Sequence, residues 1–445
     1  MGEQQPTGRI PTDRREKAAW YLFDFANTSF TVLIVTALFP LFFRRLVGDP
    51  ILGGTLWGYA GSITMLVIAV TSPILGAMAD YSGAKKKFLT FYTGLSIVFT
   101  SLMFFLREDV PSFLGVDMWM WGFILFVIAN IGFEGALPFY NAWLPEISTE
   151  EDVGRISGIG YAAGYVGAML TIIIALVSYF MLPDYPTLPF LFAAIFFLVF
   201  AVPSIIGLKE RPPSQFPDEE GVSIVTIGFR RVRKTFNKIG EYEGLPRFLA
   251  SYFLFSDAIS TVIYFAAIFG AAVYGFSDEL ILIFFAVTQL AAIPGAFVFG
   301  YIADSIGTKK TLMITLGIWI AALLIAFFGE AQIVWWTVGM IAGIGMGSSQ
   351  STARSMYGQF IPEEKKTEMF GIYALSGKFA AIIGPAVYGT VLALAASLGE
   401  AMAHRVSMLS ILGVFVIALL ILIKVRQPIM GEAHIYLEDD MRPGM

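Results

Sequence analysis

The 445-residue chain contains no cysteine and only two histidines. The missing cysteines exclude a disulfide, a thiolate metal site and a cysteine nucleophile, and two histidines argue against a histidine-based metal site. No glycine-rich loop is followed by the Lys-Ser or Lys-Thr of a phosphate-binding loop, and no catalytic nucleophile motif stands out. We therefore expect no metal, no cofactor, no nucleic-acid partner and no enzymatic activity.

Charge is also scarce, and long apolar runs take its place. Charged residues make up 14% of the chain, against roughly 25% in soluble domains, while hydrophobic residues make up 57%. A membrane-spanning helix needs about 20 mostly apolar residues, and the alternating pattern of a β-barrel is not seen. Twelve runs qualify: 18–43, 54–79, 86–106, 118–142, 156–181, 187–208, 246–274, 279–302, 310–328, 332–357, 367–396 and 404–425. The sequence predicts an all-α membrane protein with twelve transmembrane helices.

One polar turn occurs twice, 224 positions apart. The first copy follows the second run, and the second copy follows the eighth. They read Gly76-x-x-x-Asp80-x-x-Gly83-x-Lys85-Lys86 and Gly300-x-x-x-Asp304-x-x-Gly307-x-Lys309-Lys310. Internal repeats in a membrane chain are typical of secondary transporters. The sequence therefore predicts two pseudo-symmetric six-helix bundles, with both turns acting as a gating motif at one rim.

The basic residues are distributed unevenly between the two sides of the membrane. If the amino terminus is cytoplasmic, 23 Lys and Arg residues lie on that side and four lie in the opposite loops. The positive-inside rule then places both termini in the cytoplasm. No cleavable signal peptide is evident. We expect a multi-pass protein of the cytoplasmic (inner) membrane that acts as a monomer.

These spans divide the chain into five parts. We predict an amino-terminal tail (1–17), a first six-helix bundle (18–208), a cytoplasmic linker (209–244), a second six-helix bundle (245–426) and a carboxyl-terminal tail (427–445). The linker carries Pro and charge, so it does not span the membrane. Its stretch 222–240 forms either an amphipathic helix on the inner membrane surface or a solvated connection.

The twelve spans, the duplication and the two turns resemble the major facilitator superfamily. Further segments resemble bacterial relatives of the vacuole effluxer (autophagy-related amino-acid effluxer) family. The first is Trp20-Tyr-Leu-Phe-Asp24-Phe-Ala-Asn27-Thr-Ser-Phe30, the second Tyr140-Asn-Ala-Trp-Leu-Pro-Glu146, and the third Gln350-Ser-Thr-Ala-Arg354-Ser355. Phe25 and Ala353 stand where the family more often has Trp and Ser. The resemblance implies the major facilitator fold, a central cavity lined by the first, fourth, seventh and tenth helices, and a transported small molecule.

Ionisable side chains inside the expected spans are costly, at about 2.5–3.5 kcal/mol each, and so indicate function or pairing. Asp24, Glu134, Asp257 and Arg354 fall one on each expected cavity helix, and Lys378 lies near the middle of the eleventh span. Arg354 has the alternative of pairing with Glu134 or Asp24 to hold the halves together. The aromatic side chains default to packing.

Beside the gating motif, we assign two groups of candidate site residues. Proton coupling is expected from Asp24, Glu134 or Asp257, because a carboxylate in a low-dielectric site can exchange a proton. Lys378 and Arg354 can bind a substrate carboxylate or phosphate, with Asp257 the first choice of partner for Lys378. The full substrate-binding set is Asn27, Asn130, Asn141, Asp257, Tyr264, Gln289, Gln350, Arg354 and Lys378.

The leading hypothesis is a secondary active transporter that works by alternating access. Its expected substrate is a small polar solute, and amino acids or short peptides are the first candidates. Coupling of transport to protons is also expected. Membrane lipids and protons are then partners beside the solute. One alternative is an amphiphile or lipid transporter of the same fold, and another is a membrane receptor or scaffold that transports nothing. Fungal members of the family are associated with the release of amino acids from vacuoles. For this chain, that role is only what the resemblance implies.

Overall fold

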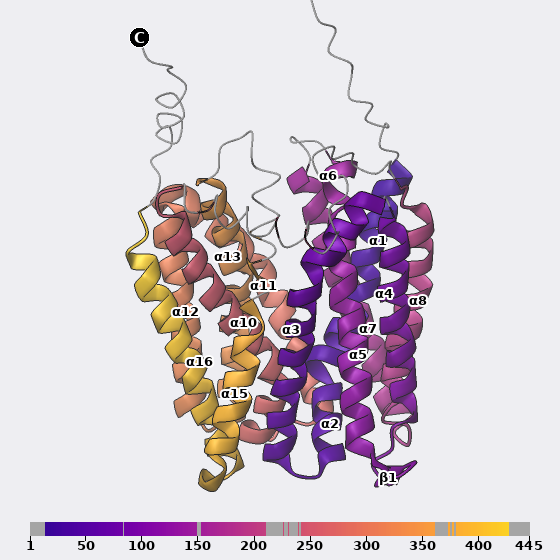
Figure 1. Cartoon of the computed structure of the whole chain (residues 1–445). Coiled ribbons are helices and arrows are strands. Elements are labelled where there is room, and N and C mark those ends of the chain that lie inside the picture. Colours follow the sequence, from indigo (N-terminus) through magenta and orange to yellow (C-terminus); the bar gives the residue numbers. More distant parts are fainter. Residues whose placement is uncertain are drawn as a thin grey trace, which may run out of the picture.

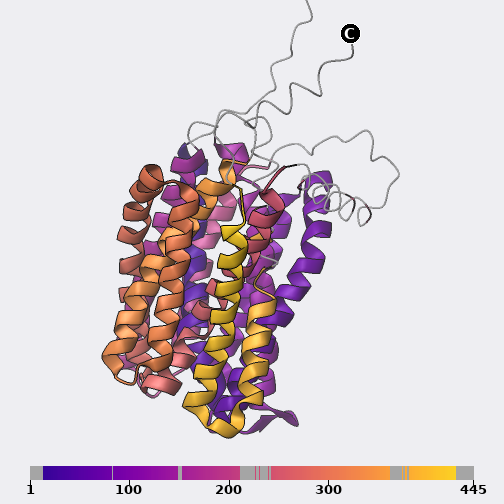
Figure 2. The ribbon, with the colours of Figure 1, turned by 90° about the vertical axis from the view of Figure 1, so that its left-hand side faces the viewer.

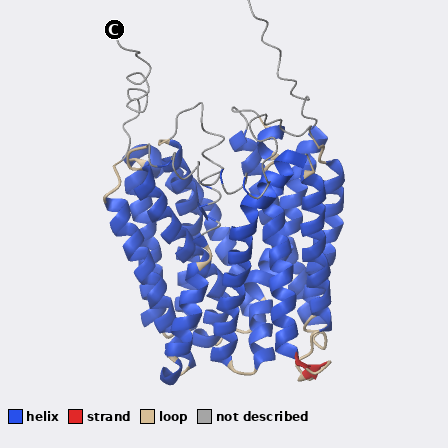
Figure 3. Cartoon of the chain, viewed as in Figure 1, coloured by secondary structure: helices blue, strands red, loops and turns tan. Residues whose placement is uncertain are grey.

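The computed structural model describes residues 14–82, 84–148, 153–210, 242–360 and 380–426, with isolated positions at 226, 230, 239, 373, 376 and 377. These residues are almost all helical, and two perpendicular views show the helices running along one common direction (Figure 1, Figure 2, Figure 3). The sequence prediction of an all-α architecture is confirmed. The expected linker at 209–244 falls mostly outside the described residues.

Two bundles follow one another along the chain (Figure 1). The first contains α1 (Arg14–Phe30), the π-helix η1 (Thr31–Ala37), α2 (Phe39–Val47), α3 (Pro50–Ser82), α4 (Lys85–Leu102), the short 3-10 helix η2 (Met103–Phe105), α5 (Met118–Asn141), α6 (Leu144–Ile147), α7 (Val153–Met181) and α8 (Leu188–Gly207). The second contains α10 (Leu245–Tyr274), α11 (Asp278–Ile306), α12 (Thr308–Phe328), α13 (Gln332–Gly358), α15 (Ile383–Leu394), the 3-10 helix η5 (Ala396–Leu398) and α16 (Glu400–Ile423). A small hairpin of β1 (Ser112–Phe113) and β2 (Val116–Asp117) pairs Ser112 with Asp117 and Phe113 with Val116.

The helix α1 begins and α16 ends at the same end of the molecule, which we call the termini face (Figure 1). The β1–β2 hairpin lies at the other end, which we call the opposite face. Among the described residues, ten helices are long and apolar enough to span a membrane. The expected tenth span is α13, which is 27 residues long but less apolar. The described part of the expected eleventh span includes the 12-residue α15.

The first span is not the single regular helix expected over 18–43. The backbone N–H of Leu38 donates to the carbonyl oxygen of Leu33, five residues earlier, at 3.1 Å. The hydroxyl of Thr36 also faces the carbonyl oxygens of Thr31 and Val32. Such i→i+5 bonds widen the helix locally, and π segments of this kind occur often at functional sites.

Local sequence signals set the helix ends at the opposite face. The carboxylate of Asp49 accepts the backbone N–H groups of Ile51 and Leu52, each at 2.9 Å, and so caps α3. Gly48 before it has φ 77° and closes α2, a conformation that costs glycine little. The hydroxyl of Ser277 caps α11 in the same way as Asp49.

Small residues let the helices of each bundle pack closely. A Cβ built on Gly167 of α7 would lie 2.2 Å from the carbonyl oxygen of Phe25 in α1. One on Gly132 of α5 would lie 2.5 Å from the backbone nitrogen of Ser96 in α4. Neither position can accept a side chain without moving the neighbouring backbone. Without a strong hydrophobic force between helices in lipid, such close contact supplies much of the packing attraction.

The two bundles meet mainly through α3 with α15, through α10 with η1 and α2, and through α7 with α11. The ribbons of the bundles lie further apart toward the termini face (Figure 1). The hydrogen bonds between α3 and α15 come from Thr55 and Tyr59, which lie near the start of α3 at the opposite face. The contact between the bundles is therefore concentrated away from the termini.

Candidate functional site

The first group of polar side chains lies in the first bundle around Asp24. Its carboxylate is within hydrogen-bonding reach of the Tyr140 hydroxyl and the Asn27 side chain. On its other side, a Cβ built on Gly160 of α7 would lie 2.6 Å from Asp24 Oδ2. Only a glycine at this position leaves room for the carboxylate. The structure thus brings together Asp24 and Asn27, which belong to two of the predicted sets, and adds Tyr140.

The partner Tyr140 is held by Trp20 in a reciprocal arrangement. The Trp20 indole N–H donates to the carbonyl oxygen of Tyr140 at 3.2 Å, and the Tyr140 hydroxyl donates to the carbonyl oxygen of Trp20 at 3.0 Å. The rings stack with centroids 4.7 Å apart. This Trp–Tyr pair fixes α1 against the end of α5 and fixes the hydroxyl beside Asp24.

The second group lies along α10 in the second bundle. Asp257 and Thr261 are almost completely buried, with exposures of 2% and 0%. One oxygen of Asp257 accepts the backbone N–H of Gly384 at 2.8 Å. A Cβ built on Gly384 would lie only 1.9 Å from the Thr261 hydroxyl. Asp257 is therefore wedged between its own helix and the start of α15.

The contact of Asp257 with Gly384 is a helix cap inside the membrane. The turn at Ala381 and Ile382 precedes α15, so the expected eleventh span is interrupted here. The first backbone N–H groups of a helix have no partner within it and carry the positive end of its dipole. Interrupted helices with their free ends at mid-membrane form the binding sites of many transporters.

A second reciprocal Trp–Tyr pair joins the two bundles. The Trp57 indole N–H of α3 donates to the carbonyl oxygen of Tyr264 at 3.3 Å, and the Tyr264 hydroxyl donates to the carbonyl oxygen of Trp57 at 2.9 Å. The rings stack with centroids 4.7 Å apart. Tyr264 was predicted to bind substrate, but here its hydroxyl is engaged in closing the interface.

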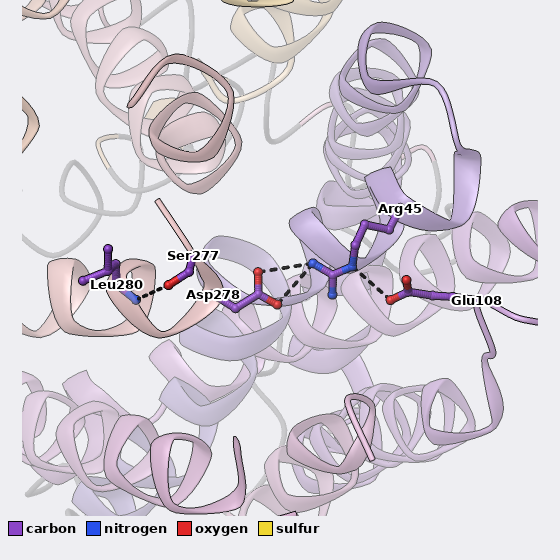
Figure 4. A network of polar contacts seen from close by, with 5 residues as sticks. All are labelled: Arg45, Glu108, Ser277, Asp278 and Leu280. Atoms are coloured by element: carbon purple, nitrogen blue, oxygen red, sulfur yellow. Dashed lines mark hydrogen bonds and ion pairs between the residues drawn. The ribbon is translucent and has the colours of Figure 1, made fainter. Parts of the chain in front are cut away.

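Charge pairs reinforce this interface at the opposite face. Arg45 of the first bundle contacts both Glu108, at 2.9 Å, and Asp278 of the second bundle, at 3.2 Å (Figure 4). Arg44 contacts Glu400 of the second bundle at 2.6 Å. Burial alone would lower the pKa of Arg45, but the charges of Asp278 and Glu108 outweigh it and raise that pKa. Arg45 therefore stays charged.

The repeated turns lie at the termini face and bind the ends of neighbouring helices. Lys85 pairs with Glu146 at 2.5 Å, which joins the first turn to the Leu-Pro-Glu segment. The Lys86 ammonium donates to the carbonyl oxygens of Ile206 and Leu208 at the end of α8. In the second copy, Lys309 donates to those of Ile423 and Val425 at the end of α16. A cation at a helix carboxyl end is favourable because it complements the dipole.

The remaining predicted residues are dispersed. Asn130 is buried, and its amide oxygen accepts no hydrogen bond from the described residues. Glu134 and Gln289 are partly exposed, while Asn141, Gln350, Arg354 and Asp304 are exposed. Glu134 and Arg354 both have interaction partners. Gly83, Lys378 and the side chain of Asp80 lie outside the described residues, so their roles stay predictions.

Sequence reasoning missed several of these groups. Trp57, Gly384 and the Arg44–Glu400 pair carry no motif and fall among many similar residues. Tyr140 and Trp20 did belong to quoted segments, but aromatic side chains were assigned to packing. The hydrogen bonds that these two side chains donate to backbone carbonyl oxygens could not be predicted from the spacing of residues in the sequence.

The family model described as "Vacuole effluxer Atg22 like" matches residues 54–154 and 149–429. The chain belongs to this family. A relative from Bacillus subtilis, "Uncharacterized MFS-type transporter YxiO", is 29% identical over 385 residues, which cover 83% of this chain and 87% of the relative. "Autophagy-related protein 22" from Coccidioides immitis is 20% identical, with 86% of this chain and 82% of the relative covered. Among the relatives of this effluxer-like family are therefore proteins named as transporters.

Solved structures of similar fold also belong to transporters. A crystal structure of the nucleoside transporter NupG has a TM-score of 0.65 at 13% identity and covers 92% of this chain and 98% of that one. A bacterial homologue of the iron transporter ferroportin has a TM-score of 0.65 at 14% identity, with coverages of 94% and 99%. At these identities the likeness establishes the fold. The predicted major facilitator fold and the family are thus confirmed, and this effluxer-like chain is a membrane transporter.

Proposed function

We propose that this protein is a proton-coupled secondary transporter of a small polar solute, with amino acids or short peptides first. The observation that carries the proposal is Asp257, a buried carboxylate at the middle of α10 whose described hydrogen bond goes to the start of an interrupted helix. Burying a charge at membrane depth is costly, so such a group marks a transport pathway or proton relay. The relatives named as effluxers support amino acids as the first solutes to test.

Each bundle contains one of the two polar groups. Asp24 with Asn27 and Tyr140 lies in the first bundle, and Asp257 lies in the second. A carboxylate in a low-dielectric site can bind a proton on one side and release it on the other. Arg354 and Lys378 are proposed to hold the anionic group of the solute. We place the termini face in the cytoplasm on the distribution of Lys and Arg.

The test is transport in proteoliposomes by wild type and Asp257→Asn. Asparagine keeps an oxygen that can accept the Gly384 N–H but cannot exchange a proton. We expect Asp257→Asn to abolish uptake driven by a pH gradient and to keep counterflow, which needs no net proton movement. Asp184→Asn, at an exposed loop position, is the matched control and should behave as wild type.

Three results would contradict the proposal. If Asp257→Asn, Asp24→Asn and Glu134→Gln each keep full pH-driven uptake, these carboxylates do not couple protons to transport. If no amino acid or peptide moves but a lysolipid does, the amphiphile transporter is the correct reading. Absence of flux across a broad panel would favour a receptor or scaffold.

A further inference from the structure

The interface at the opposite face encloses a histidine that the transport site does not use. His404 lies one turn into α16 and is completely buried. Its Nδ1 lies 2.9 Å from the Tyr388 hydroxyl of α15. Its Nε2 is also buried, and no described residue offers that atom a hydrogen bond. One half of the imidazole is thus satisfied and the other half is not.

The first bundle covers the unsatisfied side. A Cβ built on Gly54 of α3 would lie 3.4 Å from His404 Cε1 and 3.8 Å from Nε2. Gly54 belongs to the segment of α3 that packs on α15, beside the Thr55–Gly389 hydrogen bond. The helix that moves away when the bundles separate at this face is therefore the one that shields Nε2 from water.

A second proton on the imidazole is poorly tolerated while the interface is closed. Both ring nitrogens would then be donors, the Nε2–H would have no acceptor among the described residues, and burying such a charge is costly. The partner on Nδ1 is itself fixed, because the Tyr388 ring stacks on Phe265 at 3.8 Å between centroids. In an open interface, water would solvate the same proton.

The other titratable or charged groups facing this region are few in the described chain. They are Arg44 of α2, paired with Glu400 of α16, then Arg405 of α16, Tyr388 of α15, and Tyr274 of α10, over which Arg405 lies. Arg405 donates to the carbonyl oxygens of Phe327 and Gly329 and is held away from the imidazole. A protonated His404 would therefore add a cation near Arg44, one turn from the Glu400 carboxylate that Arg44 needs.

We propose that His404 is a proton-binding residue that couples acidity at the opposite face to separation of the bundles there. The closed interface holds the imidazole neutral behind Gly54, and protonation requires opening. The sign follows from linkage: the open state binds the extra proton, so acid favours opening and alkali favours closure. This inference rests on the proposed alternating access, but it involves neither Asp24 nor Asp257.

The absence of cysteine makes the test direct. Phe113→Cys and Leu398→Cys place spin labels at exposed positions of the two bundles at the opposite face. Distances are measured in nanodiscs, where both faces have the same pH. A solvated imidazole titrates at about pH 6.5, so the ratio of open to closed protein should rise by up to about tenfold for each pH unit below that value.

His404→Gln should remove most of this pH dependence, because glutamine keeps a polar group beside Tyr388 but does not titrate. Glu400→Gln is the control: it should raise the open fraction at every pH and keep the dependence on His404. If His404→Gln keeps the wild-type pH profile, the proposal is overturned. If the label distance never lengthens in any variant, both this proposal and alternating access at this face fail.

A second readout needs no His404 variant. The chain has two histidines, His404 and His434, so selective ¹³C labelling of histidine gives two imidazole signals to follow by NMR. We expect one signal to titrate with the same midpoint as the opening measured by the spin labels. Two signals that both titrate independently of opening would contradict the proposal.

Discussion

At the scale of single residues, glycines on neighbouring helices leave room for buried polar side chains, and one added carbon atom would fill that room. Gly160 leaves room for the Asp24 carboxylate, and Gly384 leaves room for the Thr261 hydroxyl beside Asp257. In both cases a glycine on a neighbouring helix admits a carboxylate into a packed interface. The acids could be predicted from the sequence because charge is rare in the spans. The glycines could not, because the chain has 44 of them and packing alone distinguishes their roles.

Gly160→Ala should therefore destabilise the protein and impair transport. The new methyl group would lie 2.6 Å from both Asp24 Oδ2 and the Trp20 ring, and overpacking of this kind costs about 1–3 kcal/mol. We expect a lower apparent melting temperature in detergent. The matched control is Gly413→Ala in α16, where nothing lies within 4 Å of the new Cβ. That variant should gain about 0.5–1 kcal/mol from helix propensity. Equal behaviour of the two variants would contradict the assignment.

At the scale of elements, the two repeated turns make the same contact from the same helix position, although different lysines of the motif occupy it. Lys86 and Lys309 both bind carbonyl oxygens at the carboxyl end of the last helix of their bundle. Lys86 is the sixth residue after Asp80 and Lys309 is the fifth after Asp304, so the two lysines do not correspond in the repeated motif. Each is nevertheless the second residue after its helix N-cap, Ala84 or Gly307. The two lysines are therefore equivalent in their distance from the start of the helix and not in their place in the motif.

The gating role of the turns is tested by Asp80→Asn and Asp304→Asn. Asp304 is exposed at the end of α11, away from Asp257. Because these residues lie at the rim, we expect slower conformational cycling with nearly unchanged solute affinity. Flux in proteoliposomes and binding by thermal shift separate the two effects, since a ligand stabilises the folded state by mass action. A loss of binding as large as the loss of flux would show that the turns belong to the binding site.

The sequence predicted most elements well and their interruptions poorly. Hydrophobic length marks a span whatever its internal geometry, so most of the predicted runs recur as helices. The π segment at Thr31–Ala37 packs against α10, and the turn before α15 is held by the contact of Asp257 with Gly384. Hydropathy does not encode those contacts. The candidate site was therefore predicted by its ionisable residues and not by the backbone features that frame them.

At the scale of the whole molecule, two similar Trp–Tyr pairs have different consequences. Trp20 and Tyr140 both belong to the first bundle, whereas Trp57 and Tyr264 join the bundles. Alternating access would leave the first pair intact and break the second in every cycle. The assignment of Tyr264 to the interface could not come from sequence, because its spacing from Asp257 fits a cavity wall equally well.

A crosslink across the interface should stop transport. Tyr59 of α3 and Thr390 of α15 are in direct contact, with their hydroxyl oxygens 3.2 Å apart. We expect Tyr59→Cys with Thr390→Cys to lose flux when a bis-methanethiosulfonate reagent joins the two thiols and to recover it with a reductant. Each single cysteine variant is a control for the substitution itself. Full flux through quantitatively crosslinked protein would show that this face does not open.

The charge pairs at the opposite face also make the protein sensitive to its electrolyte. Arg45 with Asp278 and Arg44 with Glu400 are partly exposed, and dissolved ions weaken exposed pairs, with a Debye length of about 8 Å at physiological ionic strength. Both pairs must separate when the bundles part, and separation exposes four charges to the surrounding ions. Raising the salt concentration should therefore accelerate opening without any contact with the solute. The ionic composition of the fluid at this face should therefore influence the rate of transport.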